Sequence, residues 1–264
     1  MSARLRRAAF FVLAASTACF SGAPFATSFS TNYSDLWWNP TESGWGANIT
    51  QQADTLFVTL FVYSQNAAPA WYSGTLTFAG EGINGQKTFT GELYETHGPW
   101  FGAAFNPSNV TYRNVGTVSF ASNSTSTGVL QYSVDGTIVT KNVQRQTLVY
   151  NNLGGTYLGA TQDVTSGCAN AANNGTRTSD VGTITVTHTG TSVTIQAPTC
   201  TFTGTYGQDG QAGTVAATYT CTTGSSGSIT FFDLRSEVSG IVGRYTGQDS
   251  SCKFNGNIGA LRKP

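Results

Sequence analysis

The sequence predicts an all-β protein: two tandem antiparallel up-and-down β-barrels, each of about eight strands, after a cleaved signal peptide. Composition is the first reason. The 264 residues include 31 glycines, one methionine and only 10% charged side chains, so strong helix formers are scarce. Pattern is the second reason, because from residue 27 onward short β-patterned segments alternate with Gly, Asn and Asp turns, as they do in sandwiches and barrels.

The N-terminal segment 1–26 has the features of a secretory signal peptide. Arginines precede an apolar run over residues 8–18, and small residues at 23–26 suit cleavage. The apolar run is too short to span a bilayer, so we expect a secreted or periplasmic protein that does not cross the membrane. A lipid anchor on Cys19 is the less favoured alternative, because Ser16 stands where a large aliphatic residue is expected.

Charge excludes some classes of partner. The whole chain has a formal net charge of zero, and removal of segment 1–26 takes away three arginines and leaves a charge of −3. The remainder contains no basic run. We therefore expect no nucleic-acid partner and no attraction to an anionic membrane.

The first domain is expected over residues 27–150. Asp135-Gly136 predicts a type I′ hairpin, because that turn needs positive φ at both central residues, and Asn84-Gly85 is a similar signal. The expected strands lie near 33–39, 43–52, 55–64, 69–79, 86–95, 113–121, 127–134 and 137–148.

One expected strand, residues 55–63, is apolar on both faces. Its even-numbered residues share one face, while Phe57, Phe61 and Tyr63 share the other. A strand with one solvated face alternates more cleanly. We therefore expect its second face to be covered by a loop, a partner or a ligand.

A linker is expected at residues 151–155, where composition changes. All five tryptophans precede it, and all four cysteines beyond Cys19 follow it. The second domain, residues 151–264, should therefore have a separate core stabilised by disulfides. Its expected strands lie near 156–163, 178–188, 191–197, 199–206, 212–222, 227–234, 238–247 and 251–261.

Strand register predicts the disulfide pairing. Placing Cys200 opposite Cys221 across the Asp209-Gly210 turn matches apolar residues on one face, as a register must. Cys168 then joins Cys252 by elimination, which brings the first and last strand regions together and requires the sheet to close. The matched partners are Phe202 with Tyr219, Gly204 with Ala217, and Tyr206 with Val215.

Three segments, Trp37-Trp-Asn-Pro-Thr-Glu-Ser-Gly-Trp-Gly46, Gln51-Gln-Ala-Asp-Thr-Leu-Phe57 and Trp71-Tyr72, resemble a recurring domain of exported bacterial proteins, most of them uncharacterised. The resemblance covers residues 33–148 and implies export without specifying a function. The family pattern has Gly where this chain has Ala53, so the turn there is expected to differ. The second half is similar to avidin-like and lipocalin-like barrels in strand count and Gly-x-Tyr usage only, and no ligand-binding residue carries over.

The tryptophan-rich segment is the candidate ligand site. An aromatic floor with a few polar groups is the usual make-up of a pocket for a sugar or another small molecule. The alternative is that the rings form barrel core, since Trp is mostly buried and glycines flank Trp45. Adjacent strand residues point to opposite faces, so at most one of Trp37 and Trp38 belongs to the core. The expected ligand-binding residues are Trp37, Trp38, Glu42, Trp45, Gln51, Gln52 and Trp71.

No catalytic residue, metal site or cofactor is predicted. Only two histidines occur, one in each half, which argues against a His-based zinc site. Glu92 and Glu95 are three residues apart on a strand and so cannot face one glycosidic bond together. Residues 80–85 match GxGxxG, but no helix follows, so the nucleotide interpretation fails.

The sequence alone does not specify a function. We expect a secreted, non-catalytic binding or surface-interaction protein whose ligand is a carbohydrate or a small apolar molecule. The alternatives are a structural envelope or matrix component and a secreted hydrolase using Glu42 or His97. Ligand identity and oligomeric state are left open.

Overall fold

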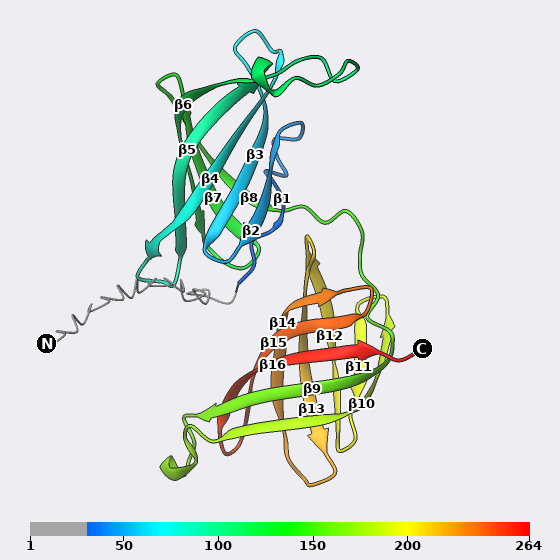
Figure 1. Ribbon diagram of the computed structural model, residues 1–264. Helices are drawn as coiled ribbons and strands as arrows, with labels where there is room; N and C mark the ends of the chain where they lie inside the picture. The colour runs from blue at the N-terminus through cyan, green and yellow to red at the C-terminus, as the bar shows by residue number, and fades with distance from the viewer. Residues whose placement is uncertain (1–30) are drawn as a thin grey trace, which may run out of the picture.

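The computed structural model describes residues 31–264, and the expected signal peptide with Cys19 lies outside that range. The described chain forms two closed antiparallel barrels of eight strands each, in tandem (Figure 1). In both barrels each strand pairs with the next, and the last pairs with the first. The predicted fold class is confirmed. No helix within residues 31–264 is long and apolar enough to cross a membrane.

The first barrel contains strands β1 to β8, and its one short 3₁₀ helix lies in the β5–β6 loop. All eight expected strands are present, with ends displaced by a few residues. The elements are β1 (Asp35–Trp38), β2 (Gly46–Gln52), β3 (Thr55–Tyr63), β4 (Pro69–Glu81), β5 (Lys87–His97), η1 (Pro107–Asn109), β6 (Thr111–Ser122), β7 (Thr127–Val134) and β8 (Thr137–Arg145).

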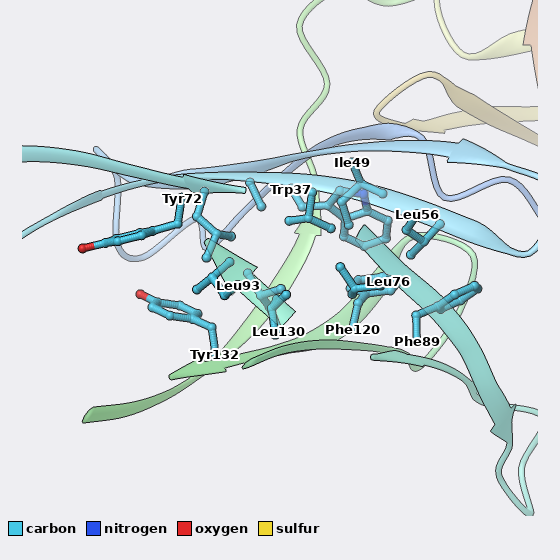
Figure 2. Close-up of a cluster of buried hydrophobic side chains, with 14 of the residues drawn as sticks. Trp37, Ile49, Leu56, Tyr72, Leu76, Phe89, Leu93, Phe120, Leu130 and Tyr132 are labelled. Carbon is cyan, nitrogen blue, oxygen red and sulfur yellow. The ribbon is translucent and has the colours of Figure 1, made fainter. Parts of the chain in front are cut away.

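The interior of the first barrel is a packed apolar core (Figure 2). Strand alternation sends Leu56, Val58 and Leu60 of β3 inward, where all three are fully buried. They meet rings from across the barrel, including Phe120 and Trp37, whose centroids are 4.8 Å apart in an edge-to-face arrangement. This lumen is therefore filled by its own side chains.

The outer face of β3 is not covered by a loop, which was one of the three expected covers. Phe57, Phe61 and Tyr63 are each about half exposed, and no loop of residues 31–264 covers them. The inner residues of the strand are wholly buried, so the double apolar pattern reflects one core face and one exposed aromatic face.

Among the first-barrel turns that have residues at positive φ, two bear directly on the sequence predictions. Asp135 and Gly136 have φ of 49° and 84° in the β7–β8 hairpin, which confirms the conditions for the expected turn type. The β2–β3 hairpin turns through Ala53 and Asp54, and Ala53 has φ of 50°. Ala53 therefore adopts the backbone conformation that favours the glycine of the family pattern.

The second barrel contains strands β9 to β16, again matching the eight expected segments, and one short 3₁₀ helix. Its elements are β9 (Gly155–Ser166), η2 (Ala171–Asn173), β10 (Arg177–Thr189), β11 (Ser192–Gln196), β12 (Cys200–Asp209), β13 (Ala212–Cys221), β14 (Ser226–Ser236), β15 (Gly240–Asp249) and β16 (Lys253–Arg262).

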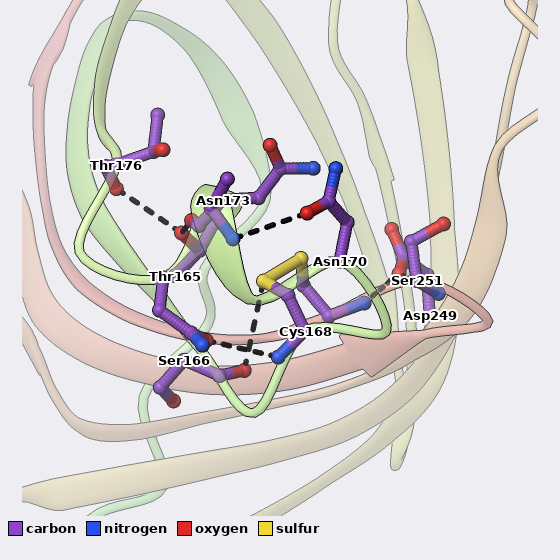
Figure 3. The surroundings of a disulfide bond; sticks show 11 residues. Thr165, Ser166, Cys168, Asn170, Asn173, Thr176, Asp249 and Ser251 are labelled. Carbon is purple, nitrogen blue, oxygen red and sulfur yellow. Dashed lines mark hydrogen bonds between the residues drawn. A yellow bond between two sulfur atoms is a disulfide. The ribbon is translucent and has the colours of Figure 1, made fainter.

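Both disulfides join the pairs expected from register. Cys200 lies opposite Cys221 in the β12–β13 ladder, with the matched apolar partners in the predicted positions. Cys168 joins Cys252 and links the loop after β9 to the start of β16 (Figure 3). Both bridges lie at one end of the barrel, which we call the distal end because the opposite end contacts the first barrel.

The barrels meet where the tip of the β12–β13 hairpin contacts the first barrel. The backbone N–H of Gln211 donates to Asp35 Oδ2 at 2.8 Å. The N–H of Gly210 donates to Thr147 Oγ1, also at 2.8 Å. A Cβ at position 210 would overlap the Asp35 carboxylate, so this close approach requires glycine.

Candidate functional site

The first barrel is closed at the end facing the second barrel by a buried ion pair over a tryptophan. Trp37 is only 1% exposed, and the Arg145 guanidinium lies 5.2 Å from its ring centroid. Arg145 also pairs with Asp35 at 3.0 Å, and both side chains are almost wholly buried. Trp37 is therefore core, and as the sequence indicated, its neighbour Trp38 points outward.

The opposite end of the first barrel has a second cation above a second tryptophan. Lys141 Nζ lies 5.8 Å from the Trp45 ring centroid and donates to Glu42 Oε2 at 2.6 Å. Trp45 Nε1 donates to the same oxygen at 3.0 Å. The hydrogen bond from Lys141 lowers the pKa of Glu42, with a smaller contribution from Trp45. Glu42 is thus held ionised in a cap, whereas a general acid needs a raised pKa.

The remaining predicted ligand-binding residues lie elsewhere on the first barrel. Trp71 is 49% exposed on the outer face of β4, opposite Phe61 of β3. The Gln51 side chain accepts from the backbone N–H of Tyr33 at 2.7 Å, near the end that faces the second barrel. Gln52 is exposed beside it. Strand β2 separates these glutamines from Trp45, so the seven predicted residues do not converge on one cleft.

The second barrel divides into a packed half and a hollow half. The half next to the first barrel is filled by buried side chains, including Tyr157, Tyr206 and Leu234. The distal half encloses a cavity of about 340 Å³. Its wall is mostly apolar and carries five aromatic rings, those of Phe202, Tyr219, Phe231, Tyr245 and Phe254.

Small inward residues on two strands leave this space. Strand β9 contributes Gly159 and Thr161 to the wall, and β10 contributes Gly182. None of these side chains reaches the lumen centre, whereas the facing strands β12 to β16 present rings. The cavity therefore results from sequence, with bulky residues on one side of the lumen and small ones on the other.

The wall of the cavity has a gap in strand pairing between β10 and β11. The β10–β11 ladder begins at Thr185 opposite Gln196, so residues 177–184 of β10 pair only with β9. The lining beside this gap includes Val181 from β10 and Pro198 from the β11–β12 turn, both exposed to solvent. The Pro198 ring packs against Gly182 across this stretch, since a Cβ at position 182 would lie 2.8 Å from Pro198 Cγ.

Two carboxylates line the cavity on the β9–β10 side. Asp163 accepts hydrogen bonds from Thr178 Oγ1 and, at 3.1 Å, from the Tyr245 hydroxyl. Asp180 is exposed, and nothing in residues 31–264 forms an ion pair or hydrogen bond with its side chain. Burial, followed by the charge of Asp163, raises the pKa of Tyr245, so its phenol is neutral at physiological pH.

This cavity was not among the sites predicted from the sequence, although the alternation along β9 is one signal that indicates it. Alternation on β9 gives Tyr157, Gly159, Thr161 and Asp163 the same inward face. A filled barrel needs large apolar residues at such positions, and a glycine, a threonine and an aspartate in succession indicate a lumen that is not filled. The ligand site was predicted in the first barrel because the tryptophan-rich segment lies there.

The other candidates have structural contacts. His188 Nδ1 accepts from the backbone N–H of Leu153 at 3.0 Å, which ties the linker to β10. His97 is exposed, with its Nε2 at 3.6 Å from Glu95 Oε1. Within residues 31–264, no three His, Cys, Asp or Glu side chains are grouped in a way that could hold a metal ion.

Comparison with known proteins gives no family assignment. No protein-family model matches the chain, and no curated protein matches it in sequence. Among solved structures, the chain is similar to isotype 1 transferrin binding protein B (TbpB) from serogroup B Neisseria meningitidis, at 10% identity and a TM-score of 0.30. The match covers 87% of this chain and 69% of that chain. A likeness at this level supports no functional argument.

Proposed function

We propose that this chain is a non-catalytic binding protein that takes a small, largely apolar ligand in the cavity of the second barrel. The observation that carries the proposal is the hollow distal half of that barrel, with its ring-lined wall and its gap between β10 and β11. Its volume of about 340 Å³ lies within the range of small-molecule sites, which are mostly apolar with a few polar groups.

The two barrels have different parts in this proposal. The first barrel has a filled lumen closed at both ends, which favours a supporting or surface role. The disulfides stabilise the distal end of the second barrel, where the unfilled core contributes less to stability through apolar packing. Disulfides are typical of proteins outside the cytoplasm, so export remains the favoured location, and the resemblance of the tryptophan motif to an exported bacterial domain stays a prediction.

Binding of a neutral, polarity-sensitive probe tests the cavity. We expect N-phenyl-1-naphthylamine to become brighter and blue-shifted with the wild-type protein. Thr161→Trp places an indole in the lumen and should abolish this response, because Thr161 lines the cavity. The matched control is Gln162→Trp, the same substitution one residue later on the exposed outer face, which should bind as wild type does.

Circular dichroism must show that both variants are folded. Equal probe binding by the two variants would contradict the proposal, as would the absence of binding to wild-type protein. Isothermal titration with the same probe supplies the stoichiometry, and the proposal requires one site per chain.

A second candidate function rests on the outer face of the first barrel, where it could bind a carbohydrate. Phe57, Phe61 and Trp71 are about half exposed there, and a shallow depression adjoins Phe57. Aromatic faces beside hydroxyl and carboxylate groups suit stacking and hydrogen bonding to a sugar. The depression is lined by Phe57, Ser73, Gly74, Thr75, Glu92 and Tyr94.

Affinity electrophoresis in gels that contain soluble neutral polysaccharides tests this second candidate. Retardation of the wild-type protein that is lost in Trp71→Ala supports it. Trp100→Ala is the control, because Trp100 is 69% exposed in the β5–β6 loop and not on the outer face of β3 and β4 that carries Phe57, Phe61 and Trp71. Equal mobility of wild type and Trp71→Ala in every gel would exclude Trp71 from such a site.

A further inference from the structure

The charge of the second-barrel cavity narrows the ligand class further. Among residues 31–264, Asp163 and Asp180 are the only charged residues that line it. Neither forms an ion pair with a basic side chain of residues 31–264. The negative charge of these two carboxylates at the cavity is therefore not balanced by a basic side chain of the described residues.

Strand register places the two carboxylates on one face. Asp163 pairs with Thr178, and Asp180 pairs with Thr161, so the aspartates are diagonal neighbours across β9 and β10. Diagonal neighbours on adjacent strands are about 7–8 Å apart. A single ammonium group can therefore lie between both carboxylates beside the gap.

Tyr219 is a further aromatic part of the cavity wall. Tyr219 is 8% exposed and lines the cavity, and its hydroxyl makes no hydrogen bond to any part of residues 31–264. Its ring lies 5.7 Å from that of Phe202 and 6.1 Å from that of Phe254. Tyr219 therefore contributes an aromatic ring, packed between two others, to the surface that an apolar ligand body would contact.

We propose that the second-barrel cavity binds a hydrophobic amine, with its cationic group beside Asp163 and Asp180 and its apolar body against the aromatic wall. This rests on the proposed function and names the ligand class for the same site. The rings of Tyr245 and Phe231 add to the selectivity, because aromatic faces attract ammonium groups. An anionic ligand of the same shape is repelled by the two carboxylates.

Three probes with one alkyl chain and different charges test the proposal by isothermal titration: n-octylamine, n-octanol and n-octanoate. At neutral pH and low ionic strength, we expect n-octylamine to bind about tenfold or more tightly than n-octanol, and n-octanoate to bind most weakly. Added salt should reduce the preference for the amine and leave the affinity for the alcohol nearly unchanged.

Variants locate the charge effect. Asp180→Asn should remove most of the preference for n-octylamine and leave the affinity for n-octanol unchanged. Asp209→Asn is the control, because Asp209 is exposed at the opposite end of the barrel, outside the cavity. Asp163 makes two hydrogen bonds, so Asp163→Asn is examined only after circular dichroism shows that it is folded.

The outcomes separate this inference from the proposed function. Equal affinities for all three probes would overturn the amine proposal and leave an apolar binding site in place. A preference that Asp180→Asn and Asp209→Asn alter equally would also overturn it. No binding of any of the three probes would contradict the proposed function itself.

Discussion

The two barrels have the same topology and strand number, but they use their interiors differently. In the first barrel, inward residues such as Leu56, Leu93 and Phe120 are fully buried, and the lumen is filled. In the second, Gly159 and Thr161 occupy inward positions and half of the lumen is open. Closed hydrogen bonding along the strands therefore suffices to define a barrel, while side-chain volume decides whether it encloses a core or a site.

Each barrel also stabilises itself by a different device. The first closes both ends with a cation over a tryptophan, and both cations, Lys141 and Arg145, come from the inward face of β8. The second barrel contains a cavity in place of packed core at its distal end, and both of its disulfides lie at that end. Covalent links at the hollow end compensate for the apolar contacts that the cavity removes.

The largest expected effect comes from truncating one phenylalanine in each interior. Phe120→Ala should lower the free energy of unfolding by about 3–5 kcal/mol, because truncation in a densely packed core creates a cavity that the neighbouring side chains do not fill. Phe231→Ala should cost about 2 kcal/mol or less, because that ring already borders an open space. Amide hydrogen exchange in urea, followed separately for the amides of each barrel, measures the two losses in free energy of unfolding. Equal losses would mean that the second barrel is as tightly packed as the first.

Removing the disulfides should destabilise only the second barrel. Each should contribute about 2–4 kcal/mol. The Cys168–Cys252 bridge spans 84 residues and the Cys200–Cys221 bridge spans 21, so loss of the first should cost more, by about 1 kcal/mol. Double Cys→Ala variants test the order. All tryptophans lie in the first barrel, so the tryptophan emission transition should stay in place while the far-ultraviolet signal weakens.

A third prediction concerns the contact between the barrels. Gly210→Ala should cost more than the roughly 1 kcal/mol of a left-handed alanine, since the added Cβ overlaps Asp35. Gly190→Ala is a matched control: Gly190 has φ of 60°, against 61° for Gly210, and nothing lies near its added Cβ. Thermal unfolding compares the two variants. Equal losses would show that the hairpin tip does not contribute to the association of the barrels.

The sequence predicted the strands, the closure and the disulfides because each depends on local pattern or register. The alternation around Cys200 and Cys221 allowed one pairing with every apolar partner matched, and the structure has that pairing. No loop of residues 31–264 covers the outer face of β3, so of the three expected covers the loop is excluded, while a partner or a ligand stays a prediction.

The candidate site could not be obtained in the same way. A tryptophan-rich motif indicates either core or ligand contact, and the difference depends on where each ring points and what lies above it. Trp37 is core and Trp71 is on the outer face, although both belong to the same motif. Predicting the cavity would have required the arrangement of several strands. No single segment of the sequence shows that Gly182 of β10 and Thr161 of β9 border the same space.

The smallest expected effect concerns Ala53, which has positive φ in the β2–β3 turn. Ala53→Gly should stabilise the first barrel by about 0.5–1 kcal/mol, because relief of left-handed strain exceeds the entropy that glycine adds to the unfolded chain. Ala68→Gly is the control. Ala68 lies in the β3–β4 turn and does not have positive φ, so this substitution should lower the stability of the first barrel by a similar amount. Urea denaturation followed by tryptophan emission measures both. If Ala53→Gly is destabilised as Ala68→Gly is, the β2–β3 turn is not strained, and the first barrel tolerates alanine there without loss.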